Sequence, residues 1–299
     1  MSVHVILFLV AVMWGINPPI MKVGLLYIDP QPYNAVRMLL AALAGWIILR
    51  PLGQWRPLGH QDRLNFIIAG VSFFLFQIFY TAGVQKTTAG NSALVMACLP
   101  VSVIMINYWH KGERTIDWKI ILGIIFSLVG VIVMVAGTGQ EFSIQGTHVR
   151  GALLLLAAQV AYGYYTVFSG ALTKIYSPYQ ITAYILLFST GLFLVIAIPS
   201  MLDTNWQMVA WQGWASILYS GLFPLCLGNC LWIWGSGVLG STKASLYNNL
   251  PPVFAITVGC LFLNESFSLL QLSGALLIFC GLYLTNKKKV MVGGNAKHE

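Results

Sequence analysis

Charged side chains are scarce in this sequence. Of its 299 residues, 8% are Asp, Glu, Lys or Arg and 58% are hydrophobic, whereas about a quarter of the residues in a soluble domain are charged. So few charges cannot cover a surface that faces water, but a surface that faces lipid needs hardly any. A soluble globular protein is therefore excluded, and the lipid bilayer is the expected surrounding of the chain.

Patterns of metal-ligating and catalytic residues are also missing. The five cysteines show no CxxC spacing, the histidines form no HExxH motif, and there is no GxSxG motif. No acid–base pair falls within one apolar run. The sequence therefore predicts no catalytic residue, no metal site and no cofactor, and the protein is not expected to be an enzyme. The net charge of +8 comes from cations between apolar runs, which indicates membrane topology and not nucleic-acid binding.

Apolar runs fill the chain instead. A membrane-spanning helix needs about 20 apolar residues, and charged or Gly/Pro-rich breaks divide the sequence into ten runs of that length. We predict spans at 3–22, 32–50, 64–84, 88–109, 117–136, 149–171, 179–199, 209–234, 241–262 and 267–286. The first run lacks the cationic start and the cleavage site of a signal peptide, so we interpret it as a retained span.

The distribution of Lys and Arg predicts the orientation. Ten spans place both termini on one side, and cytoplasmic loops carry the excess of cations. Lys22, Lys86 and Arg150 would lie outside. The other face collects Arg50, Arg56, Arg63, Lys111, Arg114, Lys119, Lys174, Lys243, Lys287, Lys288, Lys289 and Lys297. We therefore expect a multi-pass protein of a bacterial inner membrane with both termini in the cytoplasm.

The two halves of the chain resemble each other. Four residues of the first two spans recur 148 positions later, and six residues of the third to fifth spans recur 151 positions later: Gly15, Pro30, Ala35, Leu39, Gly70, Ala93, Leu99, Pro100, Gly123 and Gly130. A unit with an odd number of spans enters the membrane from opposite sides in its two copies, which is the inverted repeat of many carriers. We predict a first five-helix repeat at 1–138, a second at 139–286, and a basic cytoplasmic tail at 287–299. The expected fold is an all-α integral membrane protein of ten transmembrane helices.

A set of short motifs resembles a known family. The motifs are Trp14-Gly15 with Asn17 and Lys22, Arg37 after a Pro-rich start, Gly112-Glu113, Pro100, Pro251-Pro252 and Asn264-Glu265. Over residues 3–286 the chain resembles the EamA family of the drug/metabolite transporter superfamily. The resemblance implies ten helices as two inverted five-helix repeats. It also implies transport of amino acids, other small metabolites or drugs.

Ionisable groups are rare inside the predicted spans. None of the eight acids falls in the middle of a span, so the sequence offers no embedded carboxylate for proton exchange. Lys22 lies at the outer end of the first span, and Arg37 lies roughly 9 Å into the second. We predict that these two cations act in gating or bind a substrate carboxylate. Snorkelling of Lys22 to the interface and pairing of Arg37 with Asp29 or a helix-end carbonyl are the structural alternatives.

Polar and aromatic residues share faces on several spans. In lipid, such faces turn inward because amide and indole N–H groups lose their hydrogen bonds among acyl chains. Trp14 lies roughly 16 Å into the first span, near the middle of the membrane. The predicted substrate-binding residues are Trp14, Asn17, Gln77, Tyr80, Gln159, Tyr162, Asn229, Trp232 and Asn248, and the predicted helix breaks are Pro18, Pro100 and Pro251. For each residue alone, interhelical packing is an alternative.

These features predict a secondary transporter that moves a small molecule by alternating access. We expect an exporter of amino acids or similar amphiphilic solutes, because a pocket without a central charge suits zwitterionic or neutral molecules. Uptake of a quaternary ammonium such as choline is an alternative, since aromatic cages bind such cations. A membrane-embedded enzyme or a receptor without transport is an alternative of another class. A homo-oligomer is compatible with the sequence.

Overall fold

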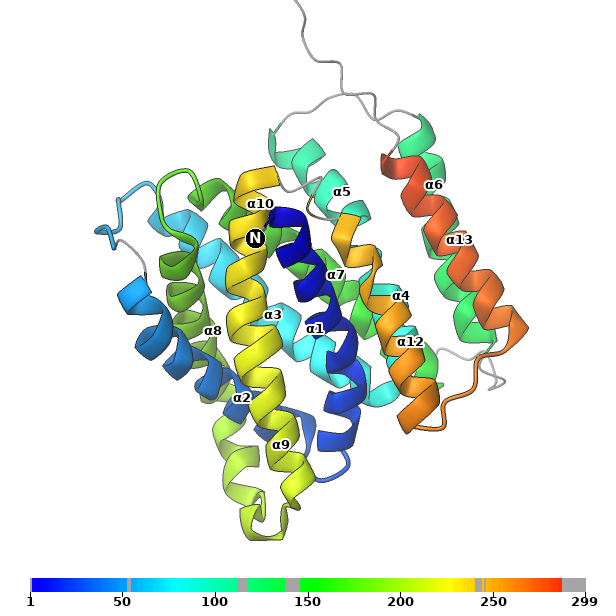
Figure 1. Cartoon of the computed structure of the whole chain (residues 1–299), viewed down its shortest axis with the longest axis horizontal. Coiled ribbons are helices and arrows are strands. Elements are labelled where there is room, and N and C mark those ends of the chain that lie inside the picture. The colour runs from blue at the N-terminus through cyan, green and yellow to red at the C-terminus, as the bar shows by residue number, and fades with distance from the viewer. Residues whose placement is uncertain are drawn as a thin grey trace, which may run out of the picture.

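The computed structural model describes residues 2–52, 55–111, 118–137, 146–239, 244 and 246–286. Within these ranges the chain is helical and contains no strand, so the all-α prediction is confirmed. The predicted tail at 287–299, Glu113 and Lys243 lie outside the described residues. Figure 1 shows the helices as one bundle, with α1 near its centre.

Helices cover each of the predicted runs. In the first 138 residues they are α1 (Val3–Gly24), α2 (Pro30–Ala44), a π-helical turn (Gly45–Leu49), a 3₁₀ turn (Arg50–Leu52), α3 (Arg63–Lys86), α4 (Ala89–Met96), α5 (Leu99–Lys111) and α6 (Trp118–Ala136). The later elements are α7 (Thr147–Leu172), α8 (Pro178–Asp203), η3 (Trp206–Met208), α9 (Trp211–Ser220), η4 (Gly221–Gly228), α10 (Asn229–Leu239), η5 (Leu246–Asn249), α12 (Pro251–Phe262) and α13 (Leu269–Asn286).

Local sequence signals start these helices. The side chains of Ser2, Thr88 and Ser177 accept hydrogen bonds from the first turns of α1, α4 and α8, as N-capping residues do. Proline is the first residue of α2, α8 and α12. The N–H group that proline lacks would have no hydrogen-bond acceptor within the helix at this position. Several predicted spans are interrupted helices: 88–109 is α4 followed by α5, 209–234 is α9, η4 and α10, and the described part of 241–262 contains η5 and α12.

Six helical segments of the described chain are long and apolar enough to cross a membrane. They are Val3–Gly24, Arg63–Lys86, Ala89–His110, Thr147–Leu172, Pro178–Asp203 and Trp211–Leu239, with shorter apolar helices at Ile121–Ala136 and Leu269–Gly281. The described acids lie at helix ends or between helices, as the sequence indicated: Asp29, Asp62, Asp203 and Glu265.

Helices α6 and α13 form a closely packed pair at one edge of the bundle (Figure 1). A methyl group added at Gly130 of α6 would lie 2.7 Å from the carbonyl oxygen of Gly274 in α13, and one added at Gly274 would lie 2.7 Å from the carbonyl oxygen of Gly130. The next contact along the pair is between Gly281 and Gly123. Glycine at these positions lets the two backbones touch.

Helix α1 occupies the centre of the remaining helices. It packs against α12 on one side, against α9 and α10 on another, and also contacts α3 and α4. Its residues Leu7, Val10 and Met21 are almost wholly buried. Because helices from both halves of the chain surround α1, the middle of this helix faces the interface between the halves.

Candidate functional site

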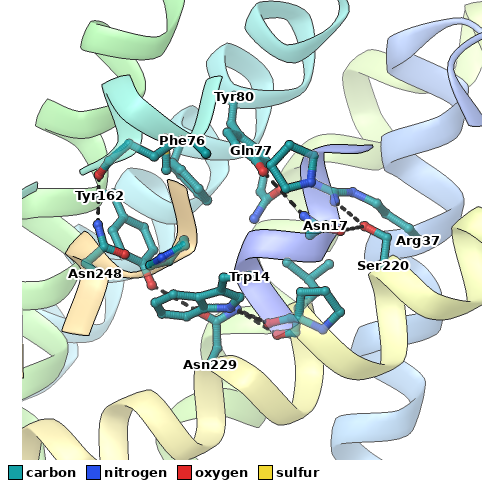
Figure 2. A pocket seen from close by; sticks show the side chains of 16 residues that line it. Trp14, Asn17, Arg37, Phe76, Gln77, Tyr80, Tyr162, Ser220, Asn229 and Asn248 are labelled. Carbon is teal, nitrogen blue, oxygen red and sulfur yellow. Dashed lines mark hydrogen bonds between the residues drawn. The ribbon is translucent and has the colours of Figure 1, made fainter. Parts of the chain in front are cut away.

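A cavity with about 580 Å³ of space between atoms, including its open side, lies beside the middle of α1. Its walls come from both halves of the chain: Trp14, Asn17, Pro18, Arg37, Phe76, Gln77, Tyr80, Ala93, Met96, Tyr162, Ser220, Pro224, Leu225, Asn229, Asn248 and Pro251. Figure 2 shows polar groups around Arg37 at one end and aromatic rings around Trp14 at the other.

The polar end is organised around the guanidinium of Arg37, which is 1% exposed. Its Nη1 donates to Ser220 Oγ at 2.7 Å, and its Nη2 donates to Gln77 Oε1 at 2.5 Å. Ser220 Oγ in turn donates to Asn17 Oδ1 at 2.7 Å, and Asn17 Nδ2 donates to the Tyr80 hydroxyl at 3.4 Å. This chain of hydrogen bonds joins α1, α2, α3 and α9 along one wall of the cavity (Figure 2).

Arg37 forms no ion pair within the described residues. Asp29, the partner considered from the sequence, does not pair with Arg37. The hydrogen-bond partners of Arg37 are neutral, and its Nε donates to Asn34 Oδ1 at 2.6 Å. The expectation of a pocket without a central charge is therefore wrong, because the second helix turns Arg37 into the cavity wall. Counting residues gives the depth of a side chain in a span but not the face on which it lies.

The aromatic end is built around Trp14. Its indole Nε1 donates to the carbonyl oxygen of Pro224 at 3.1 Å. Its ring meets Tyr162 edge-on, with centroids 6.1 Å apart, and packs on Trp232 at 5.0 Å. Phe76 packs on Tyr162 at 4.6 Å. These rings offer a solute an apolar wall with fixed orientation.

Interrupted helices surround the cavity. Pro18 and Pro19 lie inside α1 and provide no N–H for the carbonyls one turn earlier. The π-helical segment Gly221–Gly228 turns the Pro224 carbonyl toward Trp14, and π-helical turns are frequent at functional sites. Helix α4 ends at Met96, whose carbonyl oxygen accepts a bond from Asn248 Nδ2 at 2.7 Å. Backbone polar groups are thus freed at one depth, where the cavity lies.

The comparisons with known proteins agree with this architecture. The model of the EamA-like transporter family matches residues 1–136 and again residues 149–287. The chain belongs to the EamA-like transporter family. This family of the drug/metabolite transporters consists of multi-pass membrane transporters and not of enzymes. The resemblance noted from the sequence motifs is confirmed.

Relatives of this EamA-like chain cover nearly its whole length. The "Uncharacterized transporter YoaV" of Bacillus subtilis is 26% identical over 92% of this chain and 93% of its own. The "Probable terminal-alkyne amino-acid exporter" of Streptantibioticus cattleyicolor is 27% identical over 94% of this chain and 92% of its own. A solved crystal structure has a TM-score of 0.67 and 17% identity, covering 96% of this chain and 99% of that chain, which supports the fold.

Most of the predicted substrate-binding residues line the cavity of this EamA-like chain. Those in its wall are Trp14, Asn17, Gln77, Tyr80, Tyr162, Asn229 and Asn248, with the helix breaks Pro18 and Pro251. Gln159, Trp232 and Pro100 are not in the wall: Gln159 donates to Met96 Sδ, Trp232 lies behind Trp14, and Pro100 is in the first turn of α5. Contact of the wall residues with a substrate stays a prediction.

Lys22 lies away from the cavity, at the far end of α1. Its Nζ donates to the carbonyl oxygen of Thr87 at 2.7 Å and lies 3.4 Å from Glu265 Oε1. Glu265 also accepts the backbone N–H groups of Ala89 and Gly90 at the start of α4. Thr87 Oγ1 lies 3.2 Å from His148 Nδ1 of α7. We call these groups the Lys22–Glu265 cluster; it ties α1, α4 and α7 to the connection between α12 and α13.

Sequence reasoning missed three wall residues that matter to the geometry. Ser220 bridges Arg37 and Asn17, Pro224 accepts the bond from Trp14, and Phe76 covers Tyr162. Phe76 adjoins Gln77, so its side chain points about 100° away on an ideal helix, and only the packing of α3 brings both to the cavity. For Pro224, a proline inside an apolar run was a signal of a disturbed helix. Nothing in the sequence distinguishes Ser220 from other serines in spans.

Proposed function

We propose that this EamA-like protein is a secondary transporter that moves a small amphiphilic metabolite by alternating access. The cavity carries this proposal, because helices of both halves of the chain wall it and their backbones are interrupted at the same depth. Binding sites of inverted-repeat carriers are found at such helix breaks near the membrane midplane. Rocking of one half against the other would expose the cavity to each side in turn.

Two kinds of contact support an inverted repeat at 1–138 and 139–286. In the sequence comparison Trp14 corresponds to Tyr162, and these rings touch at the cavity. Gly123 and Gly130 correspond to Gly274 and Gly281, and each glycine contacts the partner of the other. Reciprocal contacts between equivalent residues are the mark of a twofold axis. The two successive family matches agree with this division.

The helix pairs follow the same exchange. Helix α1 packs on α12, and its counterpart α7 packs on α4 and α5. Helix α1 also packs on α9 and α10, whereas α7 packs on α3. We propose ten spans in a bacterial inner membrane with both termini in the cytoplasm, since this topology places most Lys and Arg residues on one side.

The two ends of the cavity suit an amphiphilic solute. Trp14, Tyr162 and Phe76 would hold an apolar group, while Asn17, Gln77 and further wall amides would hydrogen-bond a polar one. Export of amino-acid-like molecules is the best supported assignment, because one relative is named as an amino-acid exporter. The Lys22–Glu265 cluster would serve as the outer gate, which must break when the cavity opens to that side.

Flux of radiolabelled solutes into proteoliposomes tests this function. We expect saturable, protein-dependent counterflow of at least one amphiphilic metabolite in a panel of amino acids, carboxylates and amines. Trp211→Ala is the matched variant, because Trp211 is 74% exposed and is not among the residues of the cavity wall, and it should transport as the wild type does. Folded protein that moves no member of the panel faster than empty liposomes would contradict the proposal.

A further inference from the structure

Charge is distributed unevenly over the cavity wall. Among the described residues that line it, Arg37 is the only Arg, Lys, His, Asp or Glu. It forms no ion pair within the described chain, in which Lys22 pairs with Glu265. Removing a cation from water without a counter-charge costs several kcal/mol. The cavity therefore has at one end a positive charge that no carboxylate of the described residues neutralises; the ring centroid of Tyr33 lies 5.8 Å from Arg37 Cζ.

The hydrogen bonds of Arg37 show where a counter-ion would bind. Its terminal nitrogens each have one short bond to an oxygen, at Ser220 and Gln77, and one weaker contact. The weaker contacts are Nη1 to the thioether sulfur of Met21 at 3.2 Å and Nη2 to Thr81 Oγ1 at 3.4 Å. A thioether is a poor acceptor, and a hydrogen bond at 3.4 Å is long. Ser220 and Gln77 line the cavity, whereas Met21 and Thr81 do not. The N–H groups of Arg37 nearest the cavity are therefore those that donate to Ser220 and Gln77.

A carboxylate matches this arrangement better than a neutral group does. Its two oxygens accept two parallel N–H bonds from a guanidinium, and such charge-assisted bonds are about twice as strong as neutral ones. A carboxylate that takes the place of Ser220 Oγ and Gln77 Oε1 would exchange two neutral acceptors for charged ones and would neutralise the buried charge. The bonds of Arg37 to Asn34, Met21 and Thr81, which lie outside the cavity wall, could remain and hold the guanidinium in place.

The aromatic end offers no equivalent site for a cation. The oxygens nearest the rings are already engaged: Pro224 O accepts from Trp14 Nε1, and Asn229 Oδ1 accepts from the hydroxyls of Tyr162 and Tyr165 at 3.3 and 3.5 Å. No acid lies among the described wall residues. An ammonium group would find ring faces and the neutral amide of Asn248 there but no carboxylate to pair with, and Arg37 would repel it.

We propose that the cavity selects its solute by a single carboxylate bound to Arg37, with an aromatic or other apolar tail against Trp14 and Tyr162, and that an amino group is not required. This inference rests on the proposed transport function and narrows it to amphiphilic monocarboxylates. Quaternary ammonium compounds such as choline are then poor substrates, because they bring a second cation to a site that already holds one.

A matched set of ligands tests the inference on the unchanged protein. The probes are 3-phenylpropionate, its neutral isostere 3-phenylpropionamide, phenylalanine, and phenethylamine, which keeps the amine and lacks the carboxylate. Competition binding or thermal stabilisation of the full chain in detergent gives apparent affinities. We expect 3-phenylpropionate to bind at least about tenfold more tightly than the amide, as loss of charge-assisted bonds implies. Phenylalanine should bind within about threefold of 3-phenylpropionate, a difference of about 0.6 kcal/mol, and phenethylamine weakest.

Substitution of Arg37 supplies a second readout. The ratio of affinities for 3-phenylpropionate and its amide should fall toward one in Arg37→Gln, whatever happens to overall stability. Arg37→Lys keeps the charge and should keep a reduced preference, so this variant serves if Arg37→Gln does not fold. Lys22→Gln, at the cation outside the cavity wall, should leave the ratio unchanged.

The outcomes separate this inference from the proposed function. Equal binding of the acid and the amide, tighter binding of phenethylamine, or an unchanged ratio in Arg37→Gln would each overturn carboxylate selection. Absence of binding by all four probes would also overturn it. In each case, counterflow of another solute in the proteoliposome panel would still support a transporter, whereas absence of any flux would count against the transport function itself.

Discussion

Replacement of Trp14 by alanine should weaken substrate binding at least about tenfold, which corresponds to about 1.4 kcal/mol. The indole lines the cavity, and its position is fixed by the bond from Nε1 to Pro224 O and by the rings of Tyr162 and Trp232. Alanine removes the apolar wall on which the tail of a solute would lie. Trp14→Phe keeps a ring there and should lose less than about threefold in affinity.

The same substitution must also lower the stability of the fold. It removes one hydrogen bond worth about 1 kcal/mol and two ring contacts worth about 0.5 to 1.5 kcal/mol each, so the loss should be about 2 to 4 kcal/mol for this half-buried side chain. A control therefore has to match this loss without touching the cavity. Phe193 in α8 is 2% exposed, packs on Phe74 and is absent from the cavity wall.

Counterflow in proteoliposomes, corrected for the amount of folded protein, gives the apparent affinity for the solute with the largest saturable flux in the panel. We expect Trp14→Ala to raise the half-saturating concentration and Phe193→Ala to leave it unchanged while lowering the melting midpoint. If both variants shift the half-saturating concentration equally, or if neither does, then Trp14 does not contact the solute.

Three further predictions concern topology, coupling and packing. Reporter fusions within 50–63 and after α13 should indicate cytoplasm, and a fusion within 137–148 should indicate the outside; a cytoplasmic signal at 137–148 would exclude the ten-span topology. Glu265→Gln should lower stability by about 1 to 3 kcal/mol, because it weakens the cap of α4 and the ion pair of the outer gate. Saturable flux should nevertheless persist with its proton dependence unchanged, because no embedded carboxylate is expected to relay protons; abolished proton-driven flux in the folded variant would refute this. Gly274→Ala would place a methyl group 2.6 Å from a backbone nitrogen of α6 and should cost about 1 to 3 kcal/mol, whereas Gly191→Ala, with no neighbour within 4 Å, should cost much less; equal melting midpoints would show that the pair relaxes freely.

Helix positions followed from the sequence because they depend on local signals. Local sequence shows these signals: the length of an apolar run, proline in a first turn, and Ser or Thr at an N-cap. Helices α1, α2 and α8 accordingly start within two residues of the predicted limits. The interrupted helices were partly visible, since Pro18 and Pro251 mark disturbed backbone. The π-helical segment Gly221–Gly228 was not, because its register depends on the carbonyl of Pro224 meeting an indole 210 residues away in the sequence.

Helix faces were predictable, but their neighbours were not. Gln159 and Trp232 do point inward, as polar and aromatic groups in lipid must, and they are 1% exposed. Another side chain nevertheless stands between each of them and the cavity: Met96 covers Gln159, and Trp14 covers Trp232. An amphipathic face therefore predicts burial in the bundle and leaves the cavity itself undetermined.

Arg37 shows most clearly why the chemistry of the site needed the three-dimensional structure. Its hydrogen-bond acceptors at Met21, Gln77 and Ser220 lie 16, 40 and 183 positions away in the sequence, so no periodicity within one helix could reveal them. Depth in the span indicated that the cation needs a partner, and the sequence offered the nearest acid, Asp29. The bundle instead surrounds the guanidinium with neutral acceptors and leaves its charge uncompensated beside the cavity. The missing counter-charge, and not the residue type alone, is what makes a carboxylate the expected ligand.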